Sequence, residues 1–383
     1  MKAALLAAAA TFMAGPALAQ TAAPPPAAAS TAPAPAPSRW AVKEGDYVIR
    51  DFAFQSGERL PDLRMHYRTL GKPHRDKSGA IDNAVMVLHG TGGTGAQFLQ
   101  PQFADRLYGP GQPLDIARYW IILPDNIGHG GSSKPSDGLH MRFPAYDYDD
   151  MVDAQVALLT RGLGIAHPRL VFGTSMGCMH GFVMAERHPD FARALMPMAC
   201  EPVAIAGLNR MWRQLAIDGI KADPAWAGGE YKTQPAAGLR TAASLLFVAG
   251  GAPLYLQATY PTRAKASAYA QERVAASIAG LDANDLIYQL DASRNYDPWP
   301  RLEAIRTPMT WINSADDFIN PRGLPYPAEA LKRMPTARFR MIAETPETRG
   351  HGTHTWARFW EKDLVELLAR TATPAPPPPR SSR

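Results

Sequence analysis

Short apolar runs alternate with amphipathic stretches along most of this chain. Between the apolar runs 119–125 and 169–173, apolar positions recur at helical spacing over 146–165, where Gly164 is a stop signal. The stretch after Ser175 predicts another helix, which ends at His188-Pro189 because the residue before a proline disfavours helical geometry. Strands that alternate with helices predict a mostly parallel sheet flanked by helices. The apolar runs that predict buried strands are 84–90, 119–125, 169–173, 192–200, 307–314 and 337–344.

Residues 201–300 break this alternation. They are rich in Ala and Leu, helical in pattern, and punctuated by prolines and by glycine pairs. An all-helical insertion between two sheet strands predicts a lid over the carboxyl edge of the sheet, where open α/β sheets place their active sites. We therefore expect a core formed by 41–200 and 301–370, with an inserted helical lid at 201–300.

The two ends of the chain differ in composition from this core. Residues 1–19 combine a lysine, an apolar stretch and the sequence ALA, which predict a signal peptide cleaved after Ala19 and a periplasmic or secreted protein. Neither this stretch nor any other is long enough to predict a membrane span. The Ala/Pro-rich linker at 20–40 and the Pro-rich tail at 371–383 lack the apolar side chains that offset ordering entropy, so we expect disorder there.

Charge and cysteine content exclude some classes of function. The formal net charge of +5 is small for 383 residues, and no basic stripe carries interleaved aromatics, so nucleic-acid binding is disfavoured. The histidines and cysteines show no metal-binding spacing, which predicts no metal. An oxidising compartment would permit a disulfide between Cys178 and Cys200. Both lie in apolar contexts, where a buried free thiol is commoner, and we expect no disulfide.

Ser175 lies in the sequence GTSMG, between a predicted strand and a predicted helix. The pattern G-x-S-x-G alone is weak, because at about 7% glycine a chain of this length meets it by chance roughly once in ten. The strand and helix around it are the context of a nucleophile elbow. A serine nucleophile needs a base and an acid, which in this arrangement follow later strands in the order acid, then histidine.

Two aspartates compete for the role of the acid. Asp316 and Asp317 both follow the run 307–314, and we favour Asp317 because Pro321 follows it four residues on, a spacing common in hydrolases of this type. The alternative for Asp316 is a turn or cap residue that accepts backbone N–H groups.

Two histidines compete for the role of the base. His351 is flanked by Gly350 and Gly352, which allow its loop to approach Ser175 closely, and we favour it. His354 is expected in the first turn of the final helix, with a solvated or packing role.

Acyl chemistry also needs N–H donors for an oxyanion hole. We expect these from Met176, the residue after the nucleophile, and from Thr91, with Gly92 the next candidate. The same loop matches G-x-G-x-x-G at Gly90, Gly92 and Gly95. A dinucleotide site would want an acidic residue about 20 positions on, whereas Asp125 lies 35 residues after Gly90. We therefore expect no cofactor.

With these motifs in place, residues 45–370 resemble the homoserine O-acetyltransferase branch of the α/β-hydrolase superfamily. The resemblance rests on DPAWAGGEY (223–231), DANDLIYQLDAS (282–293), the elbow and SADDFINP. It implies the same triad of Ser175, Asp317 and His351. In that family an aspartate usually follows the histidine and holds the substrate's amino group, and an arginine holds its carboxylate. Here those places are Gly352 and Ala243, although Arg240 is close in sequence.

Three functions remain in view. The first is an exported serine hydrolase or esterase that acts on a small-molecule acyl substrate. The second is an O-acyltransferase with the same triad, although acetyl-CoA is not expected outside the cytoplasm. The third is a non-catalytic binding protein on the same fold. The sequence leaves open whether the chain forms a homodimer.

Overall fold

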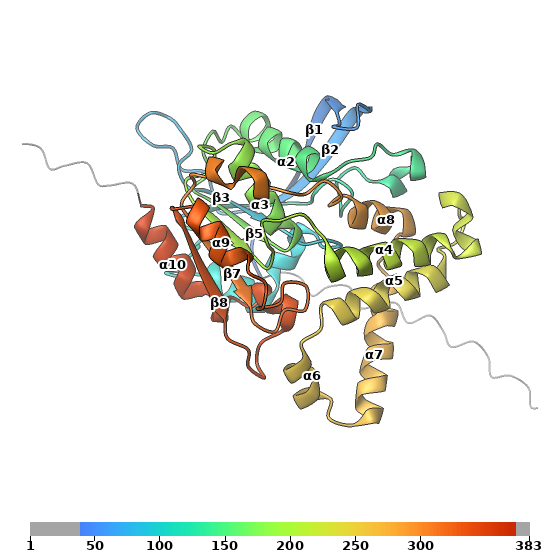
Figure 1. Cartoon of the computed structure of the whole chain (residues 1–383). Coiled ribbons are helices and arrows are strands. Elements are labelled where there is room, and N and C mark those ends of the chain that lie inside the picture. The colour runs from blue at the N-terminus through green and yellow to red at the C-terminus, as the bar shows by residue number, and fades with distance from the viewer. Residues whose placement is uncertain (1–38, 373–383) are drawn as a thin grey trace, which may run out of the picture. The chain divides into compact units, whose positions relative to one another are not determined.

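The computed structural model of the chain describes residues 39–372. The predicted signal peptide, nearly all of the predicted linker, and the tail from residue 373 lie outside the described residues. The described part is built around one eight-stranded sheet, whose strand order is β1-β2-β4-β3-β5-β6-β7-β8 (Figure 1). The strands are β1 Lys43–Ala53, β2 Arg59–Leu70, β3 Ala84–Leu88, β4 Trp120–Pro124, β5 Leu170–Thr174, β6 Leu195–Met198, β7 Met309–Ser314 and β8 Ala337–Ile342.

From β4 to β8 all neighbouring strands pair in parallel, whereas β1 and β2 pair antiparallel with each other and β2 pairs antiparallel with β4. The six predicted strands are therefore confirmed: five have shorter bounds, and the strand predicted at 169–173 is shifted by one residue to Leu170–Thr174. The hairpin of β1 and β2 was not predicted, because β1 is largely exposed and its sequence contains no continuous apolar run.

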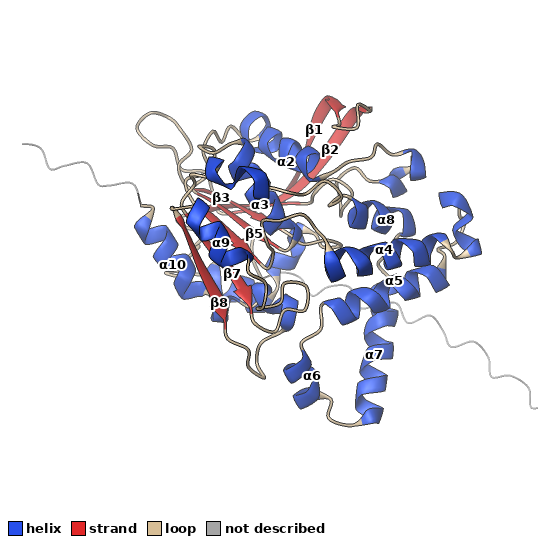
Figure 2. Cartoon of the chain, in the orientation of Figure 1, coloured by secondary structure: helices blue, strands red, loops and turns tan. Residues whose placement is uncertain are grey.

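Helices cover both faces of the sheet (Figure 2). Successive side chains of a strand point to opposite faces, and β3 shows this directly: Met86 and Leu88 join the core under α2 and α3, whereas Val85 and Val87 join the core under α1 and α10. The helices are α1 Pro101–Leu107, α2 Tyr148–Ala157, α3 Met176–Arg187, α4 Gly207–Lys221, α5 Ala236–Ala249, α6 Pro253–Thr259, α7 Arg263–Ile278, α8 Ala283–Asp291, α9 Tyr326–Arg333 and α10 Glu361–Arg370.

Both helices predicted around the elbow are present. α2 begins at a capping box, in which Asp147 accepts from the N–H of Asp150 at 3.1 Å and Asp150 accepts from the N–H of Asp147 at 3.0 Å. It continues into a π-helical turn at Leu158–Gly162. α3 ends at Arg187, just before His188-Pro189, as the proline rule predicts.

The segment 201–300 is helical, as predicted. α4, α5 and α8 pack on one another around a small core of their own that contains Trp212, Leu239 and Leu286. Figure 1 shows these helices together with α7 on one side of the molecule, while α10 lies on the other side. The turn after α5 also packs against the loop that carries His351, since a side chain at Gly350 would come within 2.2 Å of the Gly251 carbonyl oxygen.

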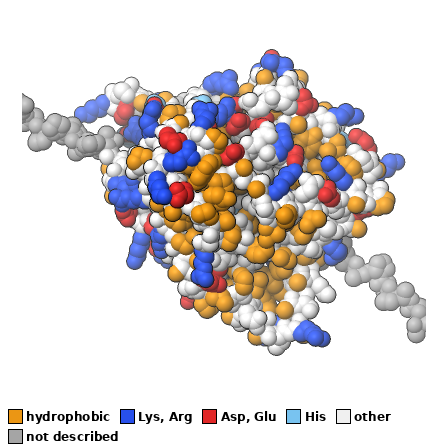
Figure 3. Space-filling view, viewed as in Figure 1, with side chains coloured by type: hydrophobic (Ala, Val, Ile, Leu, Met, Phe, Trp, Pro, Cys, Tyr) orange, Lys and Arg blue, Asp and Glu red, His pale blue; other side chains and the backbone are white. Residues whose placement is uncertain are grey.

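Several apolar side chains of this helical segment are exposed, among them Met211 at 60%, Leu215 at 56% and Val248 at 63%. In the space-filling view, hydrophobic atoms gather over this side of the protein (Figure 3). Within residues 39–372 no single helix has the length and apolar composition of a membrane span. The helices α5 and α6 have that length and composition only when taken together, and this pair is bent by 100°.

Candidate active site

Ser175 occupies a strained turn between β5 and α3. Its backbone has φ 53° and ψ −113°, a positive φ that a residue with a side chain rarely adopts. Two close approaches explain the glycines around it. A Cβ at Gly173 would lie 2.0 Å from the Gly177 carbonyl oxygen, and a Cβ at Gly177 would lie 2.3 Å from the carbonyl oxygen of Leu88. The motif therefore encodes a sharp turn packed against β3, which is the geometry of a nucleophile elbow.

The structure brings the three predicted triad residues together. His351 Nε2 lies 2.8 Å from Ser175 Oγ, and His351 Nδ1 lies 2.8 Å from Asp317 Oδ2. Because the carboxylate is an acceptor, the proton belongs on Nδ1, and Nε2 is left to accept from the serine hydroxyl. These contacts join loops after β5, β7 and β8, which end at the same edge of the sheet.

Asp317 is the buried end of the hydrogen-bonded series that runs through His351 to Ser175, and it is 1% exposed. Burial raises its pKa, but the charge of His351 and hydrogen bonds from His351, Asn320 and the N–H of Ile319 outweigh burial and hold the pKa of Asp317 below its usual value. The carboxyl is therefore ionised at neutral pH and can stabilise a protonated His351.

Asp316 has a different place. It accepts hydrogen bonds from the Thr348 hydroxyl at 2.7 Å and from the Gly350 N–H at 3.0 Å. It thus fixes the loop before His351 and makes no contact of its own with the histidine ring. This is the turn-type role that the sequence offered as its alternative.

His354 does not lie in the final helix, so that part of the prediction is wrong. It belongs to a 3-10 turn at Gly350–Thr355, whereas α10 begins at Glu361. Its ring packs edge-on against His351, with 5.3 Å between ring centres. Burial, and then the charge of His351, lowers the pKa of His354 to about 3, so this ring stays neutral.

The loop after β3 passes directly beside the serine. A Cβ at Gly90 would lie 3.2 Å from Ser175 Cβ. The next residue, Thr91, therefore begins close to the serine side chain. The N–H of Gly92 donates to His129 Nε2 at 3.3 Å, while His129 Nδ1 lies 2.9 Å from the Ile127 carbonyl oxygen. That engagement favours Thr91 over Gly92 as an oxyanion donor. The second predicted donor, Met176, is the first residue of α3, where an N–H has no acceptor within the helix.

Asp125 serves this loop structurally. It accepts from the Gly95 N–H at 2.8 Å and from the Gly131 N–H at 2.9 Å, and it pairs with Arg68 at 2.8 Å. These contacts occupy both of its oxygens, which favours the oxyanion-turn interpretation of the glycines over a dinucleotide site.

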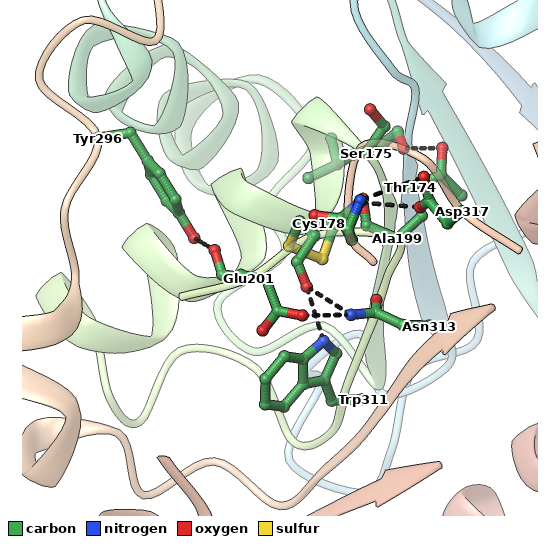
Figure 4. The surroundings of a disulfide bond; sticks show 12 residues. Thr174, Ser175, Cys178, Ala199, Glu201, Tyr296, Trp311, Asn313 and Asp317 are labelled. Carbon is green, nitrogen blue, oxygen red and sulfur yellow. Dashed lines mark hydrogen bonds between the residues drawn. A yellow bond between two sulfur atoms is a disulfide. The ribbon is translucent and has the colours of Figure 1, made fainter. Parts of the chain in front are cut away.

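The expectation of two free cysteines is wrong. Cys178, in the first turn of α3, forms a disulfide with Cys200, just after β6, and their Cα atoms are 6.0 Å apart (Figure 4). The apolar context correctly indicated burial. It carried no information about pairing, which arises because β5 and β6 are neighbours and bring both cysteines to the same edge of the sheet.

Glu201 is a site residue that the sequence reasoning missed. It is 7% exposed, and its Oε1 accepts from Asn313 Nδ2 at 2.8 Å, as Figure 4 shows. Its Oε2 is buried without a partner in the described part of the chain. Burial, followed by the negative charge of Asp317, raises the pKa of Glu201 to about 8, so this carboxyl is mostly protonated at neutral pH. An acidic residue directly after a buried strand was the available signal.

A cavity of about 280 Å³ opens onto Ser175. Its wall includes the loop after β6 and the start of α4, so the inserted helical segment forms part of the site. Two ionisable side chains, Glu201 and Arg213, belong to this wall. Arg240 does not, because it is exposed and lines a separate groove between α4 and α5. Among residues 39–372, no group of three or more His, Cys, Asp or Glu side chains is arranged to hold a metal ion.

Comparison with known proteins agrees with this architecture. Residues 83–346 match the family model described as alpha/beta hydrolase fold. A probable acyltransferase from Methanothermobacter thermautotrophicus is 30% identical over 261 residues, which cover 68% of this chain and 78% of the relative. A homoserine O-acetyltransferase from Thermobifida fusca is 32% identical over 55% of this chain, and the match spans 59% of that relative.

Solved structures support the same fold. An acetylester hydrolase from Corynebacterium glutamicum superposes with a TM-score of 0.75 at 21% identity, over 85% of this chain and 96% of its own. Proteins named as acyltransferases and as ester hydrolases are thus both similar to this one. The chain belongs to the α/β-hydrolase superfamily, in the branch that resembles homoserine O-acetyltransferase.

Proposed function

We propose that the protein hydrolyses an ester or related acyl compound through an acyl-enzyme on Ser175. The observation that carries this proposal is the continuous hydrogen-bonded chain from Asp317 through His351 to Ser175. The strained backbone of Ser175 and the adjacent Gly90–Thr91 turn also support it.

In the proposed reaction, His351 Nε2 takes the hydroxyl proton while Ser175 Oγ attacks the acyl carbonyl. Asp317 holds the ring in the required tautomer and stabilises its charged form. The N–H groups of Thr91 and Met176 donate to the oxyanion that develops. His351 then protonates the leaving alcohol, and the acyl group remains on Ser175. Water, activated by the same histidine, releases the acid and restores the serine.

Water is the proposed acceptor because two family charge partners are absent. Gly352 follows the catalytic histidine, and Ala243 is a buried apolar residue of α5. A homoserine acceptor would need partners for both its ammonium and its carboxylate, since unpaired buried charges are costly. The predicted signal peptide also separates the protein from CoA thioesters, and the Cys178–Cys200 disulfide is consistent with an oxidising compartment.

An O-acyltransferase is the second candidate, and the names of the relatives favour it. It would use the same acyl-enzyme with an alcohol in place of water. Arg213 and Glu201, which the sequence reasoning did not consider, are charged or ionisable groups in the cavity wall that an acceptor could use.

Product analysis separates the two candidates. The protein from residue 20 onward, given acetyl-CoA and homoserine together with a short-chain aryl ester, should release acid from the ester and form little O-acetylhomoserine. Rapid, stoichiometric O-acetylhomoserine would replace the hydrolase proposal by the acyltransferase. Labelling by a fluorophosphonate probe in wild type and its loss in Ser175→Ala would separate either enzyme from a non-catalytic binding protein.

A further inference from the structure

Arg213 is a buried cation that lacks a counter-ion among the described residues. It lies on α4, is 2% exposed, and forms no ion pair with any carboxylate of residues 39–372. Its Nε donates to Asn209 Oδ1 at 3.0 Å, and its guanidinium lies 4.7 Å from the centre of the Trp212 ring. Nη1 is buried and has no acceptor in that range. A guanidinium stays charged even when burial lowers its pKa, so this charge is left without a partner.

Two hydroxyl groups beside Arg213 are in a similar position. The Tyr148 hydroxyl faces Arg213, Thr91 and Ser293; burial raises the pKa of Tyr148, whereas these neighbours lower it. None of these contacts is a hydrogen bond of normal length and angle. The hydroxyl oxygens of Tyr148 and Thr91 are both buried without a partner in the described part of the chain. A guanidinium and two hydroxyl groups, all able to donate, therefore lie together with no carboxylate of the described residues paired to the guanidinium; apart from Asn209 Oδ1, the acceptors beside it are hydroxyl oxygens.

This group of donors lies next to the proposed reaction centre. Arg213 shares a cavity wall with Ser175. Thr91 follows Gly90, which packs against the serine side chain. Glu201, on the same wall, would repel an anion if ionised, but its high pKa keeps it mostly neutral at pH 7. Met179 and Phe318 give other parts of the wall an apolar lining, which suits a short alkyl chain.

We propose that Arg213 binds a free carboxylate of the substrate, so that the enzyme prefers esters carrying a carboxylate a few bonds from the scissile carbonyl. The carboxylate belongs either to the acyl part, as in a half-ester of a dicarboxylic acid, or to the alcohol part, as in an acylated hydroxy acid. The inference rests on the proposed acyl-enzyme chemistry at Ser175 and names its class of substrate.

A carboxylate fits this site better than a phosphate dianion. The planar fork of a guanidinium matches the two oxygens of a carboxylate. A dianion would call for a second cation, and Arg210, three residues earlier on α4, is already engaged: it lies 3.6 Å from Asp291 and donates to Gln214 at 2.9 Å.

The test compares hydrolysis rates of matched esters in a pH-stat at pH 7. Monomethyl glutarate is set against methyl pentanoate for the acyl side, and 3-acetoxypropanoate against propyl acetate for the alcohol side. We expect kcat/KM to favour the carboxylate ester of one pair by at least about tenfold, mostly through KM, because hydrogen bonds to charged groups are strong. Equal rates within both pairs would overturn the inference while leaving ester hydrolysis intact.

Variants test whether Arg213 causes that preference. Arg213→Met should lower the ratio of kcat/KM between charged and neutral ester about tenfold and so remove most of the preference, and Arg213→Lys should lower it less. Arg210→Gln, three residues earlier on the same helix, is the matched control and should leave the ratio unchanged. A ratio that Arg213→Met leaves unchanged, or that Arg210→Gln lowers equally, would overturn the assignment.

Binding without turnover covers the case in which Arg213→Met fails to fold. Calorimetry on the Ser175→Ala protein should show that glutarate binds at least about tenfold more tightly than glutaramide. This result would support the carboxylate site even if no ester were hydrolysed, which separates its failure from that of the proposed function. Equal binding of the two, or no binding of glutarate, would overturn it.

Discussion

The predicted triad and the cavity wall adjoin each other at Ser175, but they differ in how their polar groups are satisfied. In the triad, Asp317 receives hydrogen bonds from His351, Asn320 and the Ile319 N–H, and His351 also contacts Ser175. In the wall, Glu201 Oε2 and Arg213 Nη1 are buried without partners within residues 39–372.

This difference teaches which part of the site is complete before a substrate arrives. The predicted triad is already hydrogen-bonded from Asp317 through His351 to Ser175, as the proposed chemistry requires. The wall leaves donors and an ionisable carboxyl without partners, and buried polar groups of that kind are costly unless a ligand satisfies them. In the proposed function, the first region sets the chemistry and the second selects the substrate.

The largest expected effect breaks the triad itself. Ser175→Ala or His351→Ala should each lower kcat toward an aryl ester by several orders of magnitude, up to ~10⁶, because nucleophile and base act as a unit. His354→Ala is the control and should cost less than about tenfold, since its neutral ring only packs on His351. If His354→Ala were the more damaging variant while both proteins stayed folded, the base would be misassigned.

The acid offers a sharper test, because two adjacent aspartates differ only in what they contact. Asp317→Asn should lower kcat by about 10⁴, since an amide at this place favours the wrong histidine tautomer. Asp316→Asn should be mild, because Thr348 and Gly350 donate to the same oxygen, which an amide oxygen can replace, and the side chain does not touch His351. Steady-state kinetics on the two variants decides this, and a reversed order would transfer the role to Asp316.

Glu201, whose Oε2 has no partner in the described part of the chain, should make the free energy of unfolding depend on pH. The pKa of Glu201 is raised to about 8 from 4.5, so its contribution is fully present below pH 4.5 and is lost as pH rises through 8. Glu201→Gln mimics the protonated acid and should remove this loss, which amounts to several kcal/mol at most. Chemical denaturation of both proteins between pH 5 and 9 measures it. Parallel stability curves would show that Glu201 is ionised throughout.

The smallest expected effect concerns the covalent link between the two regions. The disulfide closes a loop of 22 residues, and its removal in a Cys178→Ala/Cys200→Ala double variant should lower the free energy of unfolding by about 3 kcal/mol. Because Cys200 precedes Glu201 in the cavity wall, KM should change more than kcat. Unfolding with and without a reductant checks the first effect, and an unchanged midpoint in wild type would contradict it.

The sequence by itself determined the parallel core of the sheet and the elements that carry the triad. Apolar runs bounded by turn residues specify buried strands locally, and the glycines around Ser175 encode an elbow because no side chain fits there. It also ranked Asp317 and His351 first, through short-range signals: a proline four residues after one, and glycines on both sides of the other. The hairpin of β1 and β2 was not predicted because β1 is largely exposed and contains no continuous apolar run.

Only the tertiary structure decided the contacts between segments far apart in the chain. The pairing of Cys178 with Cys200 depends on β5 and β6 lying side by side. The engagement of the Gly92 N–H by His129 depends on two loops meeting over the sheet edge. The place of Arg213 in the wall of the serine's cavity depends on how α4 packs there. Residue type and spacing carry no record of these distances, because they arise from packing that many different sequences between the segments could produce.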